Sequence, residues 1–170
     1  MIGDIALVGG EEFRTGCEEM DLSIMQSSGQ NPANVLIIPT AAVTGPEKAS
    51  NDGARHFSGL GGITKRLMVL DNKHANSEEF IEQIKGAGVI YFTGGSPDHL
   101  LTTLKGSLLW EQILVERSKG AIIAGSSAGA MVLGQMMRRP RLGGWVEALS
   151  AVPGIATLPH HENNDPDQIY

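Results

Sequence analysis

The chain contains a single cysteine, Cys17, among its 170 residues. One cysteine excludes an internal disulfide and a cysteine-based zinc site. No apolar run is long enough to span a membrane, and the segment Met1-Ile2-Gly3-Asp4 lacks the features of a secretory signal peptide. We therefore expect a cytoplasmic protein without a membrane partner.

Positive charge is also scarce. The 13 basic and 19 acidic residues give a formal net charge of -6. Apart from Lys65-Arg66, the one basic cluster is Arg138-Arg139-Pro140-Arg141, which is too short for a nucleic-acid-binding stripe. We expect no nucleic-acid partner.

Short apolar runs alternate with helical segments along the chain, a pattern typical of a parallel sheet covered on both faces. We predict one domain over residues 1–170, an α/β three-layer sandwich with a mostly parallel central sheet. Its expected strands are residues 5–8, 34–39, 64–70, 88–92 and 121–124, with a sixth over 154–158. Its helices are expected to include 11–28, 46–57, 78–85 and 108–117, and the segment 138–145 is expected to be irregular.

The segment Gly125-Ser126-Ser127-Ala128-Gly129 lies between an expected strand and a helix. Small residues around Ser127 allow the tight turn of a nucleophile elbow, which presents one hydroxyl above the strand end. The alternative is a plain glycine-serine turn without chemistry. We interpret Ser127, and not Ser126, as the nucleophile.

A catalytic serine needs a base, and the base needs an orienting acid. The histidines that follow Ser127 are His160 and His161, and consecutive side chains of an extended segment diverge, so only one can face it. Glu147 gives the order serine, acid, histidine, although it could equally belong to the solvated face of a short helix. Glu162 is adjacent in sequence to His161, so its carboxylate is poorly placed to orient that imidazole.

Backbone N–H groups at two strand ends could form an oxyanion hole. The first is that of Ala128, directly after the serine, and the second is that of Gly95 in Thr93-Gly94-Gly95. Other ligands fit less well. The glycine-rich segments lack a phosphate-binding pattern, and adjacent residues in His160-His161-Glu162 point in opposite directions, so we expect no cofactor and no metal site.

With these motifs in place, the chain resembles the S51 serine peptidases, the family of aspartyl dipeptidase (peptidase E) and cyanophycinase. The resemblance covers most of the chain, with Leu7-Val8-Gly9-Gly10, Tyr91-Phe92-Thr93-Gly94-Gly95 and Gly125-Ser126-Ser127-Ala128-Gly129-Ala130 as its main motifs. It implies a class I glutamine-amidotransferase-like fold, and serine at position 127 argues against glutamine amide transfer. It further implies Ser127 as nucleophile, His161 as base, and Gly95 with Ala128 as oxyanion donors.

The chain departs from the family in three respects. Ser96 stands where the family has Asn or Asp, the segment after the nucleophile helix holds no acid before Glu147, and the sequence ends soon after His161. From the third departure we expect a domain shortened at its C-terminus.

The function we expect is hydrolysis of small peptides, with aspartyl dipeptides or cyanophycin-like chains as candidate substrates. The expected substrate contacts are Gly94, Ser96, His160 and Arg138. Arg138 is among them because an arginine can bind a carboxylate through two hydrogen bonds. A non-catalytic relative that binds a small ligand or a protein partner is the alternative. A homodimer is the oligomer we expect.

Overall fold

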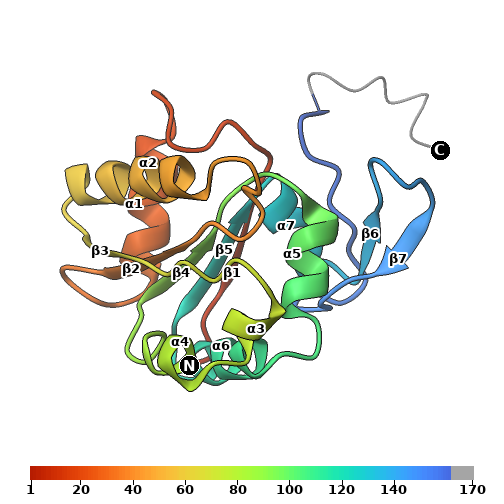
Figure 1. Ribbon diagram of the computed structural model, residues 1–170. Helices are drawn as coiled ribbons and strands as arrows, with labels where there is room; N and C mark the ends of the chain where they lie inside the picture. The colour runs from red at the N-terminus through yellow and green to blue at the C-terminus, as the bar shows by residue number, and fades with distance from the viewer. Residues whose placement is uncertain (162–170) are drawn as a thin grey trace.

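Five parallel strands form the central sheet in the order β1-β5-β4-β2-β3 (Figure 1). The computed structural model describes residues 1–161. The strand bounds are Ile5–Val8 for β1, Asn34–Ile38 for β2, Ile63–Arg66 for β3, Val89–Phe92 for β4 and Ile122–Ser126 for β5. Every residue of β4 and β5 is buried, because helices cover both faces of the sheet.

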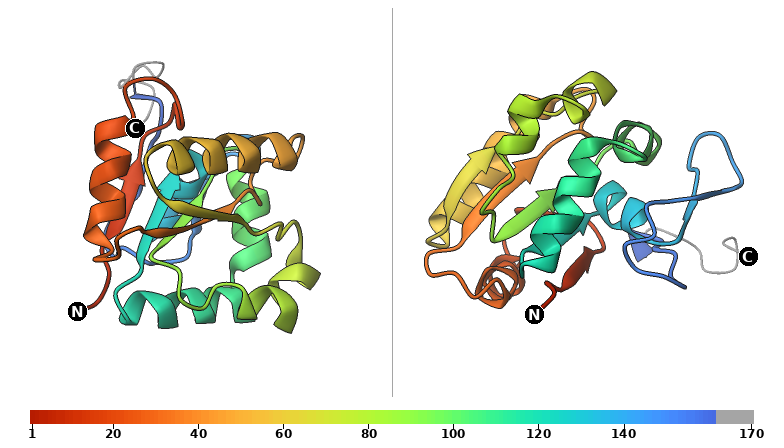
Figure 2. Two further views of the ribbon diagram at one scale, coloured as in Figure 1. Left: turned by 90° about the vertical axis from the view of Figure 1, so that its left-hand side faces the viewer. Right: turned by 90° about the horizontal axis from the view of Figure 1, so that it is seen from below.

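Helices pack on both faces of the sheet, as the views in Figure 2 show. On one face, residues of α1 and α2 join the odd-numbered residues of β2, such as Ile37, in one apolar cluster. On the other face, α5, α6 and α7 pack on the alternate residues, such as Ile38. The predicted three-layer α/β fold is confirmed. The helices are α1 Glu18–Ser27, α2 Pro46–Gly59, α3 Asn72–Ala75, α4 Glu78–Glu82, α5 Pro97–Leu104, α6 Leu108–Ser118 and α7 Ala128–Leu133.

The sheet register brings three strand ends to one level. Val8 pairs with Ser126, and Phe92 pairs with Gly125. The segments that follow β1, β4 and β5 therefore meet at the carboxyl edge, where open α/β sheets bind their ligands.

The first expected helix was placed too early. It begins at Glu18, and the preceding residues Glu11 and Phe13 have φ angles of 58° and 64°. A left-handed backbone cannot continue a right-handed helix, so residues 11–16 form an irregular loop instead.

The region after α7 also differs from expectation. Residues 154–158 form no strand, whereas β6 (Met136–Arg138) and β7 (Trp145–Glu147) pair as an antiparallel hairpin. The hairpin packs near α7, outside the main sheet (Figure 1). The sequence did not reveal it because three-residue strands are too short to show an alternating pattern.

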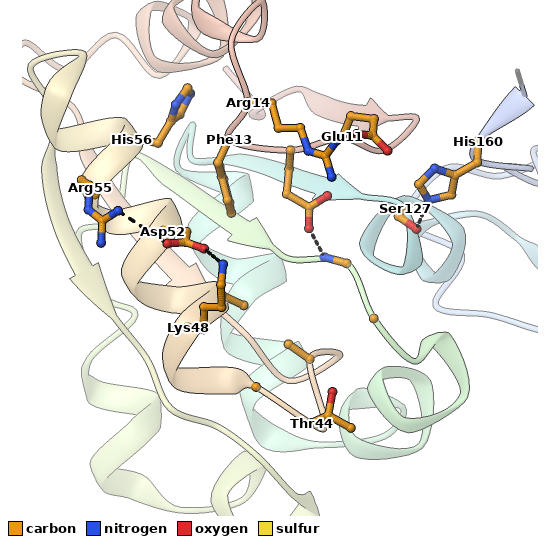
Figure 3. Close-up of a pocket in the computed structure, with 16 residues that line it drawn as sticks. Glu11, Phe13, Arg14, Thr44, Lys48, Asp52, Arg55, His56, Ser127 and His160 are labelled. Atoms are coloured by element: carbon orange, nitrogen blue, oxygen red, sulfur yellow. Dashed lines mark hydrogen bonds and ion pairs between the residues drawn. The ribbon is translucent and has the colours of Figure 1, made fainter. Parts of the chain in front are cut away.

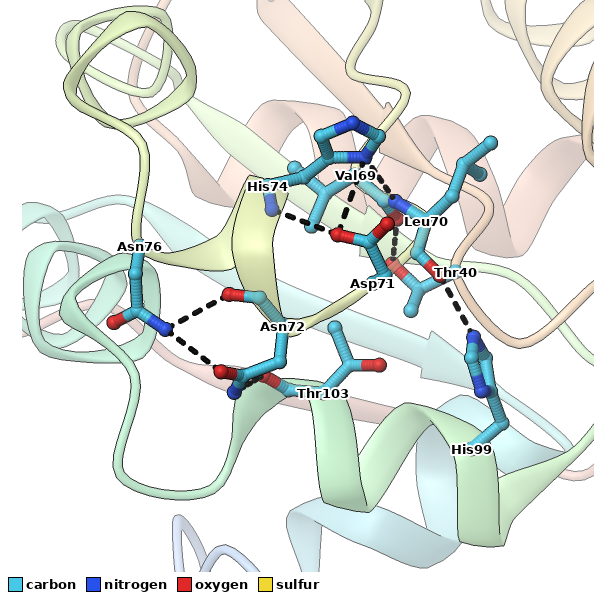
Figure 4. A network of polar contacts seen from close by, with 9 residues as sticks. All are labelled: Thr40, Val69, Leu70, Asp71, Asn72, His74, Asn76, His99 and Thr103. Carbon is cyan, nitrogen blue, oxygen red and sulfur yellow. Dashed lines mark hydrogen bonds and ion pairs between the residues drawn. The ribbon is translucent and has the colours of Figure 1, made fainter.

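A polar network ties the segment after β3 to α5 (Figure 4). His99 Nε2 lies 2.8 Å from the carbonyl oxygen of Leu70, and Asn72 Nδ2 donates to the carbonyl of Thr103. Asp71 accepts from the N–H of His74 and caps α3. The His99 side chain, on α5, therefore contacts the segment that follows β3. Within residues 1–161, every helix is too short or too polar to cross a membrane.

Candidate active site

Ser127 occupies the sharp turn between β5 and α7. Its φ and ψ angles are 49° and −109°, a region that residues other than glycine rarely adopt. The N–H of Ser127 donates to the carbonyl oxygen of Val8 at 3.0 Å, so the end of β1 holds the turn. Backbone strain of this kind is concentrated at functional sites.

The two glycines that flank the turn are required by close packing. A Cβ atom on Gly125 would lie 2.4 Å from the carbonyl carbon of Gly129. One on Gly129 would lie 2.5 Å from the carbonyl oxygen of Phe92. These contacts explain why only small residues fit on both sides of Ser127.

His160 is the histidine that contacts the serine. Its Nε2 lies 2.9 Å from Ser127 Oγ (Figure 3). The backbone N–H of His160 donates to the carbonyl oxygen of Gly9 at 2.9 Å. A Cβ on Gly10 would stand 2.4 Å from Cε1 of the imidazole. Gly10, after the end of β1, thus makes room for the ring.

The expected pairing of Ser127 with His161 is not what the structure shows. His161 is exposed and does not line the cavity at Ser127. The expectation that only one of the two histidines faces the serine agrees with this arrangement. His160 has a φ of 55°, a local reversal that the sequence pattern could not reveal and that decides which ring turns inward.

Glu147 does not join this pair. Its carboxylate lies 3.2 Å from Lys105 Nζ, and its side chain is 71% exposed. Lys105 follows the last residue of α5, whereas the site lies near the first residue of that helix. The two ends of α5 are about 12 Å apart at about 1.5 Å per residue. The other acids that follow Ser127 in the sequence, Glu162, Asp165 and Asp167, lie outside the described residues.

Gly94 and Gly95 lie beside the serine. A Cβ on Gly94 would be 3.4 Å from Ser127 Cβ, and one on Gly95 would be 2.1 Å from the carbonyl oxygen of Ala41. The N–H of Gly94 donates to Glu12. Gly95 N–H, by contrast, donates to none of the residues in 1–161. Ala128 is the first residue of α7, where backbone N–H groups have no intrahelical acceptor.

Ser127 and His160 both line a cavity of about 800 Å³. One wall comes from α2, where Lys48 and Arg55 both face Asp52 (Figure 3). One carboxylate thus serves two cations, which leaves a local excess of positive charge on that wall. The charged residues of this wall were not among those expected from the sequence.

The remaining expected substrate contacts line neighbouring cavities. Arg138 lies with Arg139 and His160 around a cavity of about 400 Å³. Ser96 lines a further cavity with Arg141, and its Oγ also accepts from the N–H of His99 at 3.3 Å as the cap of α5. His160 lines both the cavity of about 400 Å³ and the cavity at Ser127.

A buried ionisable pair lies at the rim of the main cavity. His56 Nε2 is 2.8 Å from Asp21 Oδ2, and the two side chains are 10% and 1% exposed. Burial raises the pKa of Asp21 above its usual value, and the hydrogen bond from His56 partly opposes this. Asp21 Oδ1 meets no hydrogen-bond donor in the described part of the chain.

Sequence reasoning missed Glu12. Its carboxylate accepts from the N–H of Gly94 and from Ser126 Oγ, each at 2.8 Å. The available signal was its position directly after Gly9-Gly10-Glu11, at the carboxyl end of a strand that borders the serine strand.

Comparison with known proteins identifies the family of the chain. The sequence profile of Peptidase family S51 matches residues 5–169. A peptidase from an acI-B1 Actinobacterium, known from its crystal structure, is 34% identical, with a TM-score of 0.86 over 95% of this chain and 70% of that one. A putative Peptidase E protein from Listeria monocytogenes EGD-e shares the fold at 23% identity, with a TM-score of 0.70 over 98% of this chain and 82% of that one. The chain belongs to peptidase family S51 and is a serine-type peptidase.

Proposed function

We propose that the chain hydrolyses peptide bonds in small peptides, with Ser127 as nucleophile and His160 as general base. The observation that carries this proposal is the 2.9 Å contact between Ser127 Oγ and His160 Nε2 in a strained turn at the mouth of a cavity. A serine hydroxyl needs a base at this range to become nucleophilic.

In the first half of the reaction, Ser127 Oγ attacks the carbonyl carbon and its proton passes to His160 Nε2. The N–H groups of Gly95 and Ala128 stabilise the developing oxyanion. His160 then returns the proton to the leaving amine, and an acyl-enzyme remains on Ser127. In the second half, His160 activates a water molecule that releases the acid.

This proposal places the base at residue 160, where the resemblance implied 161, because His160 has the contact. It leaves Glu147 out of the mechanism, since the carboxylate of Glu147 pairs with Lys105 at the other end of α5.

For the substrate, we propose peptides with an aspartyl residue at the scissile bond. The cavity beside His160 has two arginines and no acidic residue in its described lining. Arg139 is already paired with Asp98, whereas Arg138 is exposed and has no ion pair with a residue in 1–161. Arg138 is therefore the guanidinium available for a carboxylate.

Labelling with a fluorophosphonate probe tests the nucleophile. We expect the wild-type protein and Ser126→Ala to be labelled and Ser127→Ala to be unlabelled. Labelling of Ser127→Ala, or no labelling of the wild type together with no turnover of any dipeptide, would contradict a catalytic Ser127.

Hydrolysis of Asp-Leu, Asn-Leu and Ala-Leu tests the substrate class. We expect Asp-Leu to have the highest kcat/KM, and Arg138→Ala to lower that value by about 10- to 100-fold, since a hydrogen bond to a charged group contributes about 1.5–3 kcal/mol. Arg141→Ala, a change in the loop that follows Arg138 and β6, is the control and should leave the preference intact. Equal kcat/KM for the three dipeptides would reject the acidic preference and leave the peptidase assignment standing.

A further inference from the structure

Glu12 contacts two of the strand ends that form the site. Its Oε1 accepts from the N–H of Gly94, at the end of β4, and its Oε2 accepts from Ser126 Oγ, at the end of β5. Glu12 itself follows β1. One carboxylate therefore connects three strand ends that are far apart in the sequence.

The backbone around Glu12 is held in an uncommon conformation. Its neighbours Glu11 and Phe13 have φ angles of 58° and 64°, and a positive φ is rare for a bulky aromatic residue. The ring of Phe13 packs against Phe57 and Tyr91 at centroid distances of 6.0 and 5.3 Å. This apolar anchor offsets the strain and fixes the loop in the position that directs Glu12 toward the site.

The contacts of Glu12 determine which N–H groups remain for the substrate. Because Glu12 takes the N–H of Gly94, the next N–H along the chain, that of Gly95, is the free donor at this strand end among residues 1–161. On the serine side, Ser126 is fully buried and directly precedes the nucleophile. The carboxylate thus constrains the residue before the oxyanion donor and the residue before Ser127.

We propose that Glu12 is a positioning residue that sets the spacing between the oxyanion donor Gly95 and the nucleophile Ser127. Its role is to hold the two strand ends in the geometry that fits the tetrahedral intermediate, without contact to the reacting atoms. This inference rests on the proposed function of Ser127.

A positioning role predicts a loss in kcat with KM nearly unchanged, because the oxyanion interaction is strongest in the transition state. We expect Glu12→Ala to lower kcat by about 100-fold, comparable to the loss of one oxyanion donor. Glu12→Gln keeps an oxygen acceptor for the N–H of Gly94. Its kcat is therefore expected to be about tenfold higher than that of Glu12→Ala. Ser126→Ala removes one contact only and should be milder than Glu12→Ala.

The experiment measures kcat and KM for the dipeptide that turns over fastest, with kcat normalised to the number of sites that a fluorophosphonate labels at saturation. Normalisation removes losses caused by unfolded protein. Glu19→Gln is the matched control, because Glu19 is exposed on α1 and lines neither of the cavities at His160, and it should keep kcat within about twofold.

Three results would overturn the inference. They are an unchanged normalised kcat in Glu12→Ala, a rise in KM alone, which would indicate direct contact with the substrate, and an equal loss in Glu12→Gln and Glu12→Ala. If Ser127→Ala is inactive while Glu12→Ala is fully active, the positioning role fails and the proposed function stands. If Ser127→Ala retains turnover, the proposed function itself fails.

Discussion

Nε2 of His160 lies 2.9 Å from Oγ of Ser127, and the backbone N–H of the same histidine donates a hydrogen bond to the carbonyl oxygen of Gly9, near the other end of the chain. The base is therefore positioned by the strand end that also supports the serine through Val8. Both reacting side chains thus depend on the end of β1 for their placement.

We expect His160→Ala to lower kcat by several orders of magnitude, as removal of a triad base does. His161→Ala is the neighbouring control, and it should keep kcat within about threefold, since surface substitutions have small effects. Steady-state hydrolysis of a dipeptide measures both. A loss in His161→Ala with full activity in His160→Ala would restore the assignment that the resemblance implies.

Gly10→Ala should displace the imidazole of His160. Its new Cβ would lie 2.4 Å from Cε1, and Gly10 has a φ of 140°, which alanine rarely adopts. We expect a fall in kcat of about 10- to 100-fold, because a misplacement of about 1 Å can cost that much.

Gly9→Ala is the control for that experiment. Nothing in the described part of the chain lies within 4 Å of a Cβ at position 9, so kcat is expected to change little. Wild-type activity in Gly10→Ala would show that the ring tolerates the added methyl group.

Glu147→Gln should leave catalysis unchanged. The ion pair with Lys105 is exposed, and pairs of this kind contribute about 0–1 kcal/mol to the free energy of unfolding. We expect kcat/KM within about twofold of wild type, since the side chain is on the surface and remote from Ser127. A loss of several orders of magnitude would return Glu147 to the mechanism.

Asp21 should make the free energy of unfolding depend on pH. Burial raises its pKa in the folded state above the ordinary value of 3.8, so the folded chain holds this proton more tightly than the unfolded chain. The resulting stabilisation is present at low pH and is lost as the pH rises above 3.8 and through the raised pKa. Asp21→Asn has no such loss.

The difference in unfolding free energy, Asp21→Asn minus wild type, should therefore increase with pH over that range. Urea unfolding at a series of pH values measures it. A difference that is constant with pH would show that Asp21 titrates alike in both states. Glu18 and Asp71, whose pKa values are lowered, act in the opposite direction but are common to both proteins.

The sequence was sufficient for the five strands of the central sheet and for the strand-to-helix turn at Ser127, but not for the sixth strand expected over 154–158. Buried strands such as β2 and β4 are continuous apolar runs, and glycine at 125 and 129 indicates a tight turn from residue type alone. Both signals are local, since they depend on neighbouring residues.

The choice between His160 and His161, and the role of Glu12, could not be read in the same way. Each depends on the backbone conformation at a single position, which no periodic pattern encodes. The φ angle is 55° at His160 and 64° at Phe13. The role of Glu12 also depends on contacts between residues far apart in the sequence, such as that with Gly94. Residue type and spacing carry no information about such contacts.

The strand order has a consequence for how the enzyme loses activity. β1 is an edge strand that pairs with β5 alone in the sheet, and its first three residues are only half-buried. Segments with few buried contacts open before the rest of a protein unfolds. Because Val8, Gly9 and Glu12 hold the serine, the histidine and the glycine strand end, detachment of β1 would disassemble the site while β2, β4 and β5 remain paired. Peptidase activity should accordingly disappear at a lower urea concentration than the one at which the amides of β4 begin to exchange with solvent.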